Sequence, residues 1–179
     1  MNNIRLHDKT FKLYISENQI HKAIDALAEQ MNEDLKNEDC PVFLSVLNGS
    51  FMFTADLVRK MQIPVELSFI KLASYSGTRS TGAVQELIGL NTIIENRTVV
   101  IVEDIVDTGV TLEKLVETLK PYRPKQVKIC TLLLKPDQYK KNIPLDYVAL
   151  KIPNAFIVGY GLDYDALGRQ LPDLYVVES

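Results

Sequence analysis

Residues 98–115, TVVIVEDIVDTGVTLEKL, hold an apolar run that breaks into three acids, a glycine and two threonines. The run predicts a buried strand, because β-branched residues favour strands and continuous apolar runs favour parallel sheets. The periodic pattern that follows, TLEKLVETLK, predicts a helix. Glu103, Asp104 and Asp107 therefore stand where a buried strand ends and a turn leads into a helix.

The same order of strand, helix and strand recurs along the chain. Periodic apolar positions predict helices over about 16–35 and 51–61. Further strands are predicted at VFLSVL, VELSFIKLA and QVKICTLLL, and shorter ones at YVALKI, FIVGY and LYVV. Strands joined by crossover helices predict an α/β fold, with a central parallel β-sheet flanked by helices. The segment SYSGTRSTGAVQE has no periodicity and is predicted to be a long loop.

Composition indicates one globular domain. The 179 residues are 46% hydrophobic and 24% charged, which excludes disordered and fibrous classes. A net charge of −3 gives no general attraction to nucleic acid or an anionic membrane. No window reaches the ~20 apolar residues of a membrane span, so a cytoplasmic location is expected. Cys40 and Cys130 lack the spacing of a metal site and are interpreted as reduced thiols.

The loop after the central strand has the chemistry of a phosphate site. In open parallel sheets, ligands bind beyond the carboxyl ends of the strands. Gly109 allows an unusual backbone conformation, and with Thr108, Val110 and Thr111 it leads into a helix N-terminus. Free N–H groups, hydroxyls and the helix dipole then suit a phosphate monoester. The upstream acids suit sugar hydroxyls or a divalent cation, so the loop is predicted to bind a phosphorylated sugar.

Other interpretations of this loop are weaker. Taken singly, each of its residues is more simply explained by helix capping. The glycine patterns of P-loops and of dinucleotide-binding folds are absent. The acids Asp104 and Asp107 stand three apart, whereas aspartyl-phosphate phosphatases place theirs two apart. The combination of acids, glycine and threonines favours the phosphorylated sugar.

The stretch VVIVEDIVDTGVTL closely resembles the 5-phosphoribosyl-pyrophosphate (PRPP) motif of type I phosphoribosyltransferases. LNGSFMFTADL, KLASYSGTRSTGAV, LLLK and FIVGYGLDYDALGRQLPDLYVV resemble, in order, the loops of the hypoxanthine-guanine branch. The resemblance implies the type I fold, with a core over about 16–135 and a small hood from 1–15 and 136–179. It also implies transfer of 5-phosphoribose from PRPP to N9 of a 6-oxopurine, release of pyrophosphate, a requirement for Mg²⁺, and a homodimer or homotetramer.

The resemblance further implies a role for each matching residue. Asp107, Thr108, Gly109, Val110 and Thr111 match the 5-phosphate loop. Glu103 and Asp104 match the acids that face the ribose hydroxyls and Mg²⁺. Asp107 also matches the general acid/base at purine N7, a task that suits a carboxylate whose pKa approaches neutrality.

Pyrophosphate and purine contacts follow from the same resemblance. The matches to the pyrophosphate loop and the lid are Leu47, Asn48, Gly49, Ser74, Tyr75 and Arg169. Many relatives carry Lys or Arg where this chain has Asn48, and in this family the peptide before that position is often cis. Lys135 matches the donor to purine O6, Phe156 the stacking ring, and Ile157 the main-chain contact to the base. Asp163 matches the residue that holds a Mg²⁺, normally through water, near the pyrophosphate, and it is also counted among the purine-binding residues.

Two alternatives remain beside a purine salvage enzyme. One is a non-catalytic PRPP-sensing regulator on the same fold, because fold alone does not determine function. A DNA-binding regulator is expected to carry a basic helical extension, which this chain lacks. The other is a pyrimidine or adenine transferase of the same superfamily, which Lys135 and GYGLDY disfavour. Preference among hypoxanthine, guanine and xanthine is open at this stage.

Overall fold

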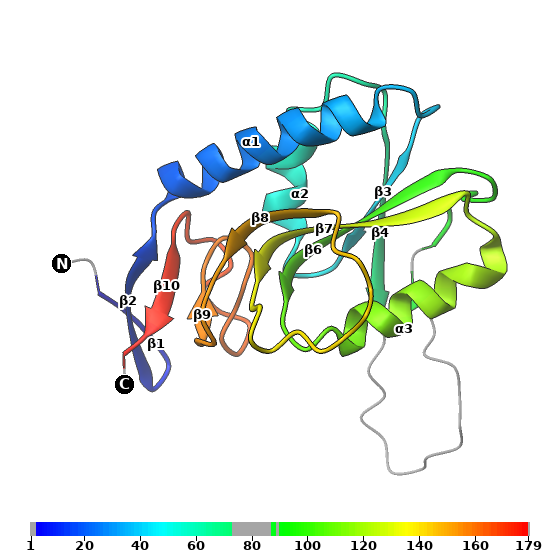
Figure 1. The fold of residues 1–179 in the computed structure, drawn as a ribbon. Helices are drawn as coiled ribbons and strands as arrows, with labels where there is room; N and C mark the ends of the chain where they lie inside the picture. The colour runs from blue at the N-terminus through cyan, green and yellow to red at the C-terminus, as the bar shows by residue number, and fades with distance from the viewer. Residues whose placement is uncertain (1–2, 73–86, 89, 179) are drawn as a thin grey trace, which may run out of the picture.

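A computed structural model describes residues 3–72, 87–88 and 90–178, and its larger sheet has six strands (Figure 1). Their order is β5-β4-β3-β6-β7-β8, and all but β5 pair in parallel. The strands span β3 Val42–Val46, β4 Glu66–Leu72, β5 Leu87–Ile88, β6 Thr98–Val106, β7 Gln126–Leu134 and β8 Tyr147–Lys151. The predicted parallel sheet is confirmed, with the quoted stretch at its centre as β6.

Helices cover both faces of this sheet. The helices α1 (Glu17–Leu35) and α2 (Phe51–Val58) lie on one face, and α3 (Val110–Leu119) lies on the other (Figure 1). A short 3-10 helix, Lys120–Tyr122, continues α3. Burial of alternate β6 residues explains the two layers: Val100 and Val102 pack with α1 and α2, whereas Val99 and Ile101 pack with α3.

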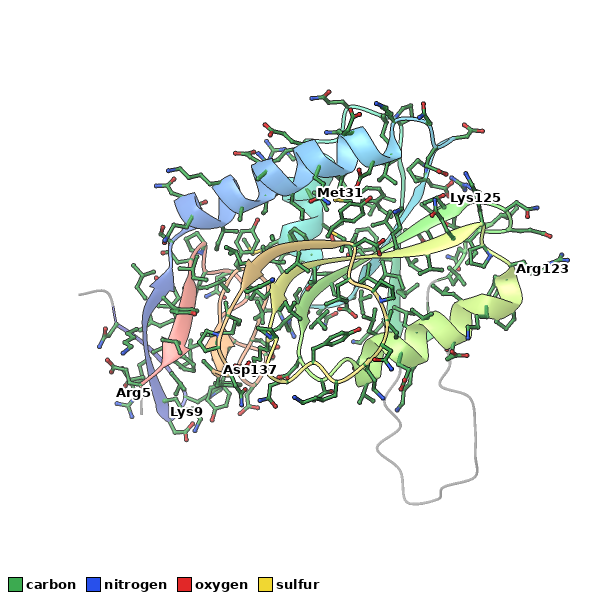
Figure 2. All side chains as sticks on the ribbon, in the orientation of Figure 1. Arg5, Lys9, Met31, Arg123, Lys125 and Asp137 are labelled. Atoms are coloured by element: carbon green, nitrogen blue, oxygen red, sulfur yellow. The ribbon has the colours of Figure 1, made fainter. Side chains whose placement is uncertain are left out.

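The first helix shows how the periodic pattern becomes packing. Its N-cap Ser16 donates its backbone N–H to the Gln19 side chain at 3.0 Å, which helps to fix the start of α1. The periodic apolar residues all face the sheet: Ile20, Ile24, Leu27, Ala28, Met31 and Leu35. Met31 points from α1 toward the sheet, where Cys130 Sγ lies 3.8 Å from its sulfur (Figure 2). No helix in the described part of the chain is long and apolar enough to cross a membrane.

A second, antiparallel sheet lies beside the first and joins both ends of the chain. Its order is β1-β2-β10-β9, and its strands are β1 Ile4–Leu6, β2 Lys9–Ile15, β9 Ile157–Val158 and β10 Leu174–Val177. The two N-terminal strands were not predicted, because they are short, charged residues interrupt their apolar residues, and only Phe11 among them is fully buried. β8 pairs with β7 in the larger sheet, so the expected hood segment 136–179 is divided between the two sheets.

Glu38, which follows α1, links that end of the helix to the start of β6 through side-chain hydrogen bonds. Its carboxylate accepts hydrogen bonds from Thr98 Oγ1 at 2.5 Å and from Lys125 Nζ at 2.9 Å. The Thr98 hydroxyl, followed by Lys125, lowers the pKa of Glu38 below its ordinary value of 4.5. A lowered pKa in the folded state adds stability above pH 4.5 that is lost as the pH falls through the folded value.

We therefore expect Glu38→Gln to lower the free energy of unfolding by about 1 kcal/mol at pH 7, and by much less at pH 3. Urea denaturation at the two pH values measures both differences. Glu33→Gln is a matched control, because Glu33 is 71% exposed at the same end of α1. An equal loss at both pH values for Glu38→Gln would contradict the assignment of its carboxylate to this network.

Candidate active site

The carboxyl ends of three neighbouring strands bring the predicted site residues together. The order β3-β6-β7 places the loop at 47–50, the turn at 107–109 and Lys135 at one edge of the sheet. Parallel strands make this unavoidable, because all of their carboxyl ends lie on the same side. Residues that are separated by up to 88 positions thereby form one site (Figure 1).

The turn after β6 forms a cradle at the N-terminus of α3. Gly109 has φ +82° and is the N-cap of the helix. A Cβ on Gly109 would lie 2.5 Å from the ring of Tyr139, so both its conformation and its surroundings require glycine. A pocket of about 240 Å³ opens here, lined by Glu103, Ile105 and residues 106–112. Backbone N–H groups at a helix start suit a phosphate, so the geometry fits the predicted role of this loop.

A second pocket adjoins the first, and the two share Ile105 and Asp107. It has a volume of about 280 Å³ and brings together these predicted residues: Asp104, Asp107, Lys135, Phe156, Ile157 and Asp163. Ile105, Ala155 and Leu162, which the sequence did not indicate, complete its lining. Phe156 is 44% exposed, and Tyr164 meets it edge-on with ring centroids 5.6 Å apart. An exposed aromatic face held from behind is suited to stacking on a planar base.

Lys135 and Asp107 form an ion pair inside this second pocket. Lys135 Nζ lies 2.8 Å from Asp107 Oδ2 and 3.4 Å from Asn154 Oδ1. Lys135 is 9% exposed, and its ion pair with Asp107 offsets the cost of burying an ammonium group at the end of an apolar strand. Sequence reasoning missed Asn154, because nothing in its local sequence marks it as a partner of a residue 19 positions away.

The neighbouring acids of β6 face different pockets. Successive strand residues point to opposite faces, so Glu103 borders the phosphate cradle and Asp104 borders the second pocket. Burial raises the pKa of Glu103 well above its ordinary value, and the nearby Asp104 adds to this. Burial also raises the pKa of Asp104, to about 6. Ile105 and Asp107 border both pockets. A sugar that joins a phosphate in the first pocket to a base in the second would therefore lie along the end of β6.

The residues predicted to bind pyrophosphate lie close to two acids of the second pocket, Asp104 and Asp163. The Leu47–Asn48 peptide is cis. A Cβ on Gly49 would lie 1.4 Å from Asp104 Oδ2, so this loop touches the acid directly. Arg169 donates from Nη1 to the Gly161 carbonyl at 2.6 Å, and its Nη2 lies 2.6 Å from Asp163 Oδ1. The predicted lid residues Ser74 and Tyr75 lie outside the described residues.

The acids fit a divalent cation that is bound partly by other ligands. No group of three or more His, Cys, Asp or Glu residues in the described ranges is arranged to hold a metal by itself. Mg²⁺ commonly binds through one or two carboxylates plus water and substrate phosphates. Asp104 fits this pattern, because a nearby cation favours the charged form that burial disfavours.

Comparisons with known proteins agree with this geometry. Residues 15–165 match the family model described as phosphoribosyl transferase domain. The chain is 42% identical over 165 residues to a hypoxanthine phosphoribosyltransferase of Buchnera aphidicola, covering 91% of this chain and 93% of the relative. It is 38% identical over 168 residues to the hypoxanthine-guanine phosphoribosyltransferase of Bacillus subtilis, covering 93% of each.

A solved structure shows the same fold. The crystal structure of the hypoxanthine phosphoribosyltransferase of Trypanosoma cruzi aligns with a TM-score of 0.83 and 37% identity, covering 93% of this chain and 96% of that one. The predicted type I fold, a central parallel sheet flanked by helices, is thereby confirmed. The chain belongs to the phosphoribosyltransferase family, in its hypoxanthine-guanine branch.

Proposed function

We propose that this protein transfers 5-phosphoribose from PRPP to N9 of hypoxanthine or guanine, giving IMP or GMP and pyrophosphate. The observation that carries this proposal is the Lys135–Asp107 pair at 2.8 Å in an aromatic-lined pocket, with Asp107 also bordering the adjoining phosphate cradle. A donor for O6 and a carboxylate for N7 stand together there, as a 6-oxopurine requires. The relatives named above carry this activity in their names.

The cradle and the β6 acids hold the sugar phosphate. Backbone N–H groups of 107–111 and the hydroxyls of Thr108 and Thr111 donate to the 5-phosphate, helped by the dipole of α3. Glu103 and Asp104 accept hydrogen bonds from the ribose hydroxyls when they are ionised. The sugar C1 then lies toward the second pocket, where the base binds.

The second pocket selects and activates the purine. Lys135 donates to O6, which favours a 6-oxo group because the hydrogens of a 6-amino group repel an ammonium ion. Phe156 stacks on the base, and the main chain of Ile157 meets its Watson–Crick edge. When Lys135 donates to purine O6, it no longer pairs with Asp107. Asp107 is then free to accept or donate the proton at N7.

The 47–49 loop and Arg169 bind the leaving pyrophosphate. Backbone groups of Leu47, Asn48 and Gly49 and the Arg169 guanidinium meet its oxygens, which carry increasing negative charge as the bond to C1 breaks. Glu103, Asp104 and Asp163 would contribute to Mg²⁺ binding, directly or through water, and the ion would supply further positive charge to that leaving group. Ser74 and Tyr75 are proposed to cover the site from the lid.

Replacing the purine-reading lysine is expected to weaken base binding selectively. We expect Lys135→Met to raise KM for hypoxanthine by about tenfold, the scale of one hydrogen bond from a charged donor. KM for PRPP is expected to change little, because Lys135 does not border the phosphate cradle. Steady-state kinetics with each substrate varied in turn give both values, and Lys140→Met, an exposed neighbour, is the control. A rise in KM for PRPP alone would contradict the assignment.

A panel of bases tests the proposed activity. Incubation of the protein with PRPP, Mg²⁺ and hypoxanthine, guanine, xanthine or adenine gives a separate kcat/KM for each base. The proposal predicts turnover with hypoxanthine or guanine and the lowest value for adenine. Absence of turnover with every 6-oxopurine would reject the enzyme and favour the PRPP-sensing alternative.

We also propose a homodimer or homotetramer in the cytoplasm. The support is family membership; in one solved relative, the hypoxanthine phosphoribosyltransferase of Trypanosoma cruzi, the role of the C-terminal region in the oligomeric state has been studied. Light scattering coupled to gel filtration measures the mass, and a monomer of 20.2 kDa would contradict the proposal.

A further inference from the structure

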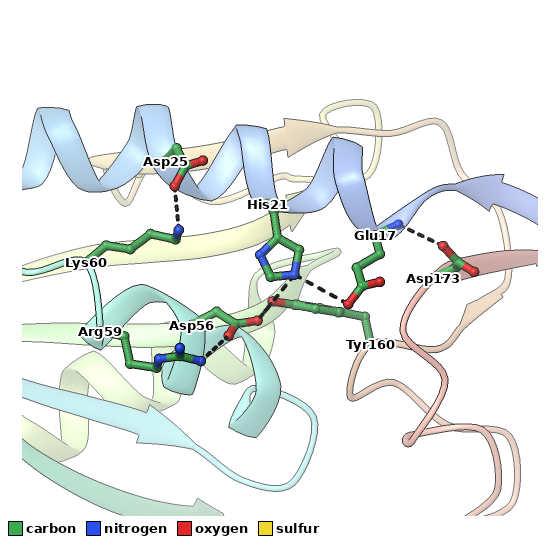
Figure 3. A network of polar contacts seen from close by, with 8 residues as sticks. All are labelled: Glu17, His21, Asp25, Asp56, Arg59, Lys60, Tyr160 and Asp173. Atoms are coloured by element: carbon green, nitrogen blue, oxygen red, sulfur yellow. Dashed lines mark hydrogen bonds and ion pairs between the residues drawn. The ribbon is translucent and has the colours of Figure 1, made fainter.

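Tyr160 is a buried tyrosine that joins the smaller sheet region to the helical layer. It follows β9, is 1% exposed, and donates its hydroxyl to Asp56 Oδ2 of α2 at 2.5 Å (Figure 3). The two residues are 104 positions apart in the sequence. Burial, and then the contact with Asp56, raises the pKa of the Tyr160 hydroxyl, which therefore remains a hydrogen-bond donor at working pH.

Asp56 is itself held by both helices on that face. Arg59 Nη1 lies 3.7 Å from Asp56 Oδ1, and His21 Nε2 of α1 lies 3.9 Å from Asp56 Oδ2. The His21 ring meets the Tyr160 ring edge-on, with centroids 6.4 Å apart (Figure 3). The acceptor of the tyrosine is therefore a carboxylate in a fixed set of contacts.

The backbone beside Tyr160 holds Arg169. Tyr160 N–H donates to the Leu171 carbonyl at 2.8 Å, and Gly161 N–H donates to the Arg169 carbonyl at 3.0 Å. The Gly161 carbonyl in turn accepts from Arg169 Nη1 at 2.6 Å. Any shift of the Tyr160 backbone is therefore transmitted to the guanidinium assigned to pyrophosphate.

The same backbone also touches the pyrophosphate loop. A Cβ on Gly161 would lie 2.1 Å from the Gly49 carbonyl oxygen, so the two glycines are in direct contact. Gly49 belongs to the loop that leads into α2, the helix that carries Asp56. The Tyr160–Asp56 hydrogen bond and the Gly161–Gly49 contact thus join the same two segments at two points.

We propose that Tyr160 is a positioning residue for the pyrophosphate half of PRPP, acting through its hydroxyl on Asp56. The hydrogen bond fixes the 159–161 backbone against α2, which sets the separation between the Arg169 guanidinium and the 47–49 loop. The inference rests on the proposed phosphoribosyl transfer, and adds to it a residue that touches neither PRPP nor the purine. Tyr160 does not line the purine pocket, and the groups that it positions, Arg169 and the 47–49 loop, are those assigned to pyrophosphate, so its effect is expected on KM for PRPP.

Removing only the hydroxyl tests this role. Tyr160→Phe is expected to raise KM for PRPP by about tenfold, the scale of a hydrogen bond to a charged acceptor, with KM for hypoxanthine nearly unchanged. Asp56→Ala is expected to give the same selective rise, whereas Asp56→Asn keeps an acceptor oxygen and is expected to retain KM near that of the wild type. Tyr175→Phe is the control, since it removes another buried tyrosine hydroxyl, bonded to Asp173 at 3.2 Å, from the smaller sheet.

Thermal unfolding of each variant separates positioning from stability. The inference predicts that Tyr160→Phe and Tyr175→Phe lower the melting temperature to a similar degree, while only Tyr160→Phe changes KM for PRPP. Equal kinetics for the two variants, or a matching rise in both KM values for Tyr160→Phe, would overturn it. Failure of the proposed function is distinguishable, because wild-type protein would then show no turnover in the same assay.

Discussion

Asp107→Asn is expected to lower kcat by about a hundredfold or more, the scale of a lost general acid/base. The amide cannot exchange a proton with purine N7, and it also weakens the pair with Lys135, which lies 2.8 Å away. The dissociation constant for PRPP is expected to change little, because the backbone of residue 107, which is proposed to bind the 5-phosphate, is retained. The loss is therefore expected in turnover and not in sugar-phosphate binding.

Two measurements establish this separation. Steady-state kinetics give kcat, and isothermal titration calorimetry gives the dissociation constant for PRPP with Mg²⁺. Asp137→Asn is the matched control, because it makes the same chemical change at an exposed position two residues beyond Lys135. Unchanged kcat in Asp107→Asn would remove Asp107 from the proton transfer, and loss of PRPP binding would assign its carboxylate to the sugar phosphate.

Gly49→Ala is expected to lower kcat/KM for PRPP by about a hundredfold, in the range that small displacements of catalytic groups cost. The added methyl group would lie 1.4 Å from Asp104 Oδ2 and 2.5 Å from Asp104 Cγ. Either the carboxylate rotates away from the ribose, or the loop moves away from the pyrophosphate. Both movements are expected to disturb PRPP, whereas Lys135, the proposed donor to the purine, is not among the atoms nearest to the added methyl group.

Kinetics with PRPP varied, together with a melting curve, measure this effect. We expect a folded variant in which KM for hypoxanthine remains near the wild-type value. A wild-type kcat/KM for PRPP would show that the contact between Gly49 and Asp104 has no part in substrate binding. A rise in KM for hypoxanthine alone would place the loop at the base instead.

The fold was predictable where local patterns carry it. The periodic apolar residues of α1 and the continuous apolar runs of β3, β6 and β7 predicted their own structures, and parallel pairing followed from the connecting helices. The smaller sheet was not predicted as such, because it depends on pairing β2 with β10 across the whole chain. A strand of three residues such as β1 is too short to carry a periodic signal of its own.

The residues of the site likewise divide into those that a local pattern predicts and those that it does not. The cradle at 107–111 was predictable because its residues are contiguous and its glycine and threonines have local chemical meaning. The placement of Arg169 and Asp163 came from the family resemblance, since singly they are ordinary surface charges. Asn154 and Tyr160 were missed because their importance lies in contacts with distant residues, which no local pattern records.

The product ratio tests the central claim most directly, namely that this edge of the sheet transfers 5-phosphoribose to a 6-oxopurine. The wild-type protein is incubated with PRPP, Mg²⁺ and hypoxanthine, and IMP and pyrophosphate are quantified by chromatography over time. The account predicts that the two products form in equal molar amounts and that both form far more slowly when adenine replaces hypoxanthine. Binding of PRPP without formation of either product would contradict it.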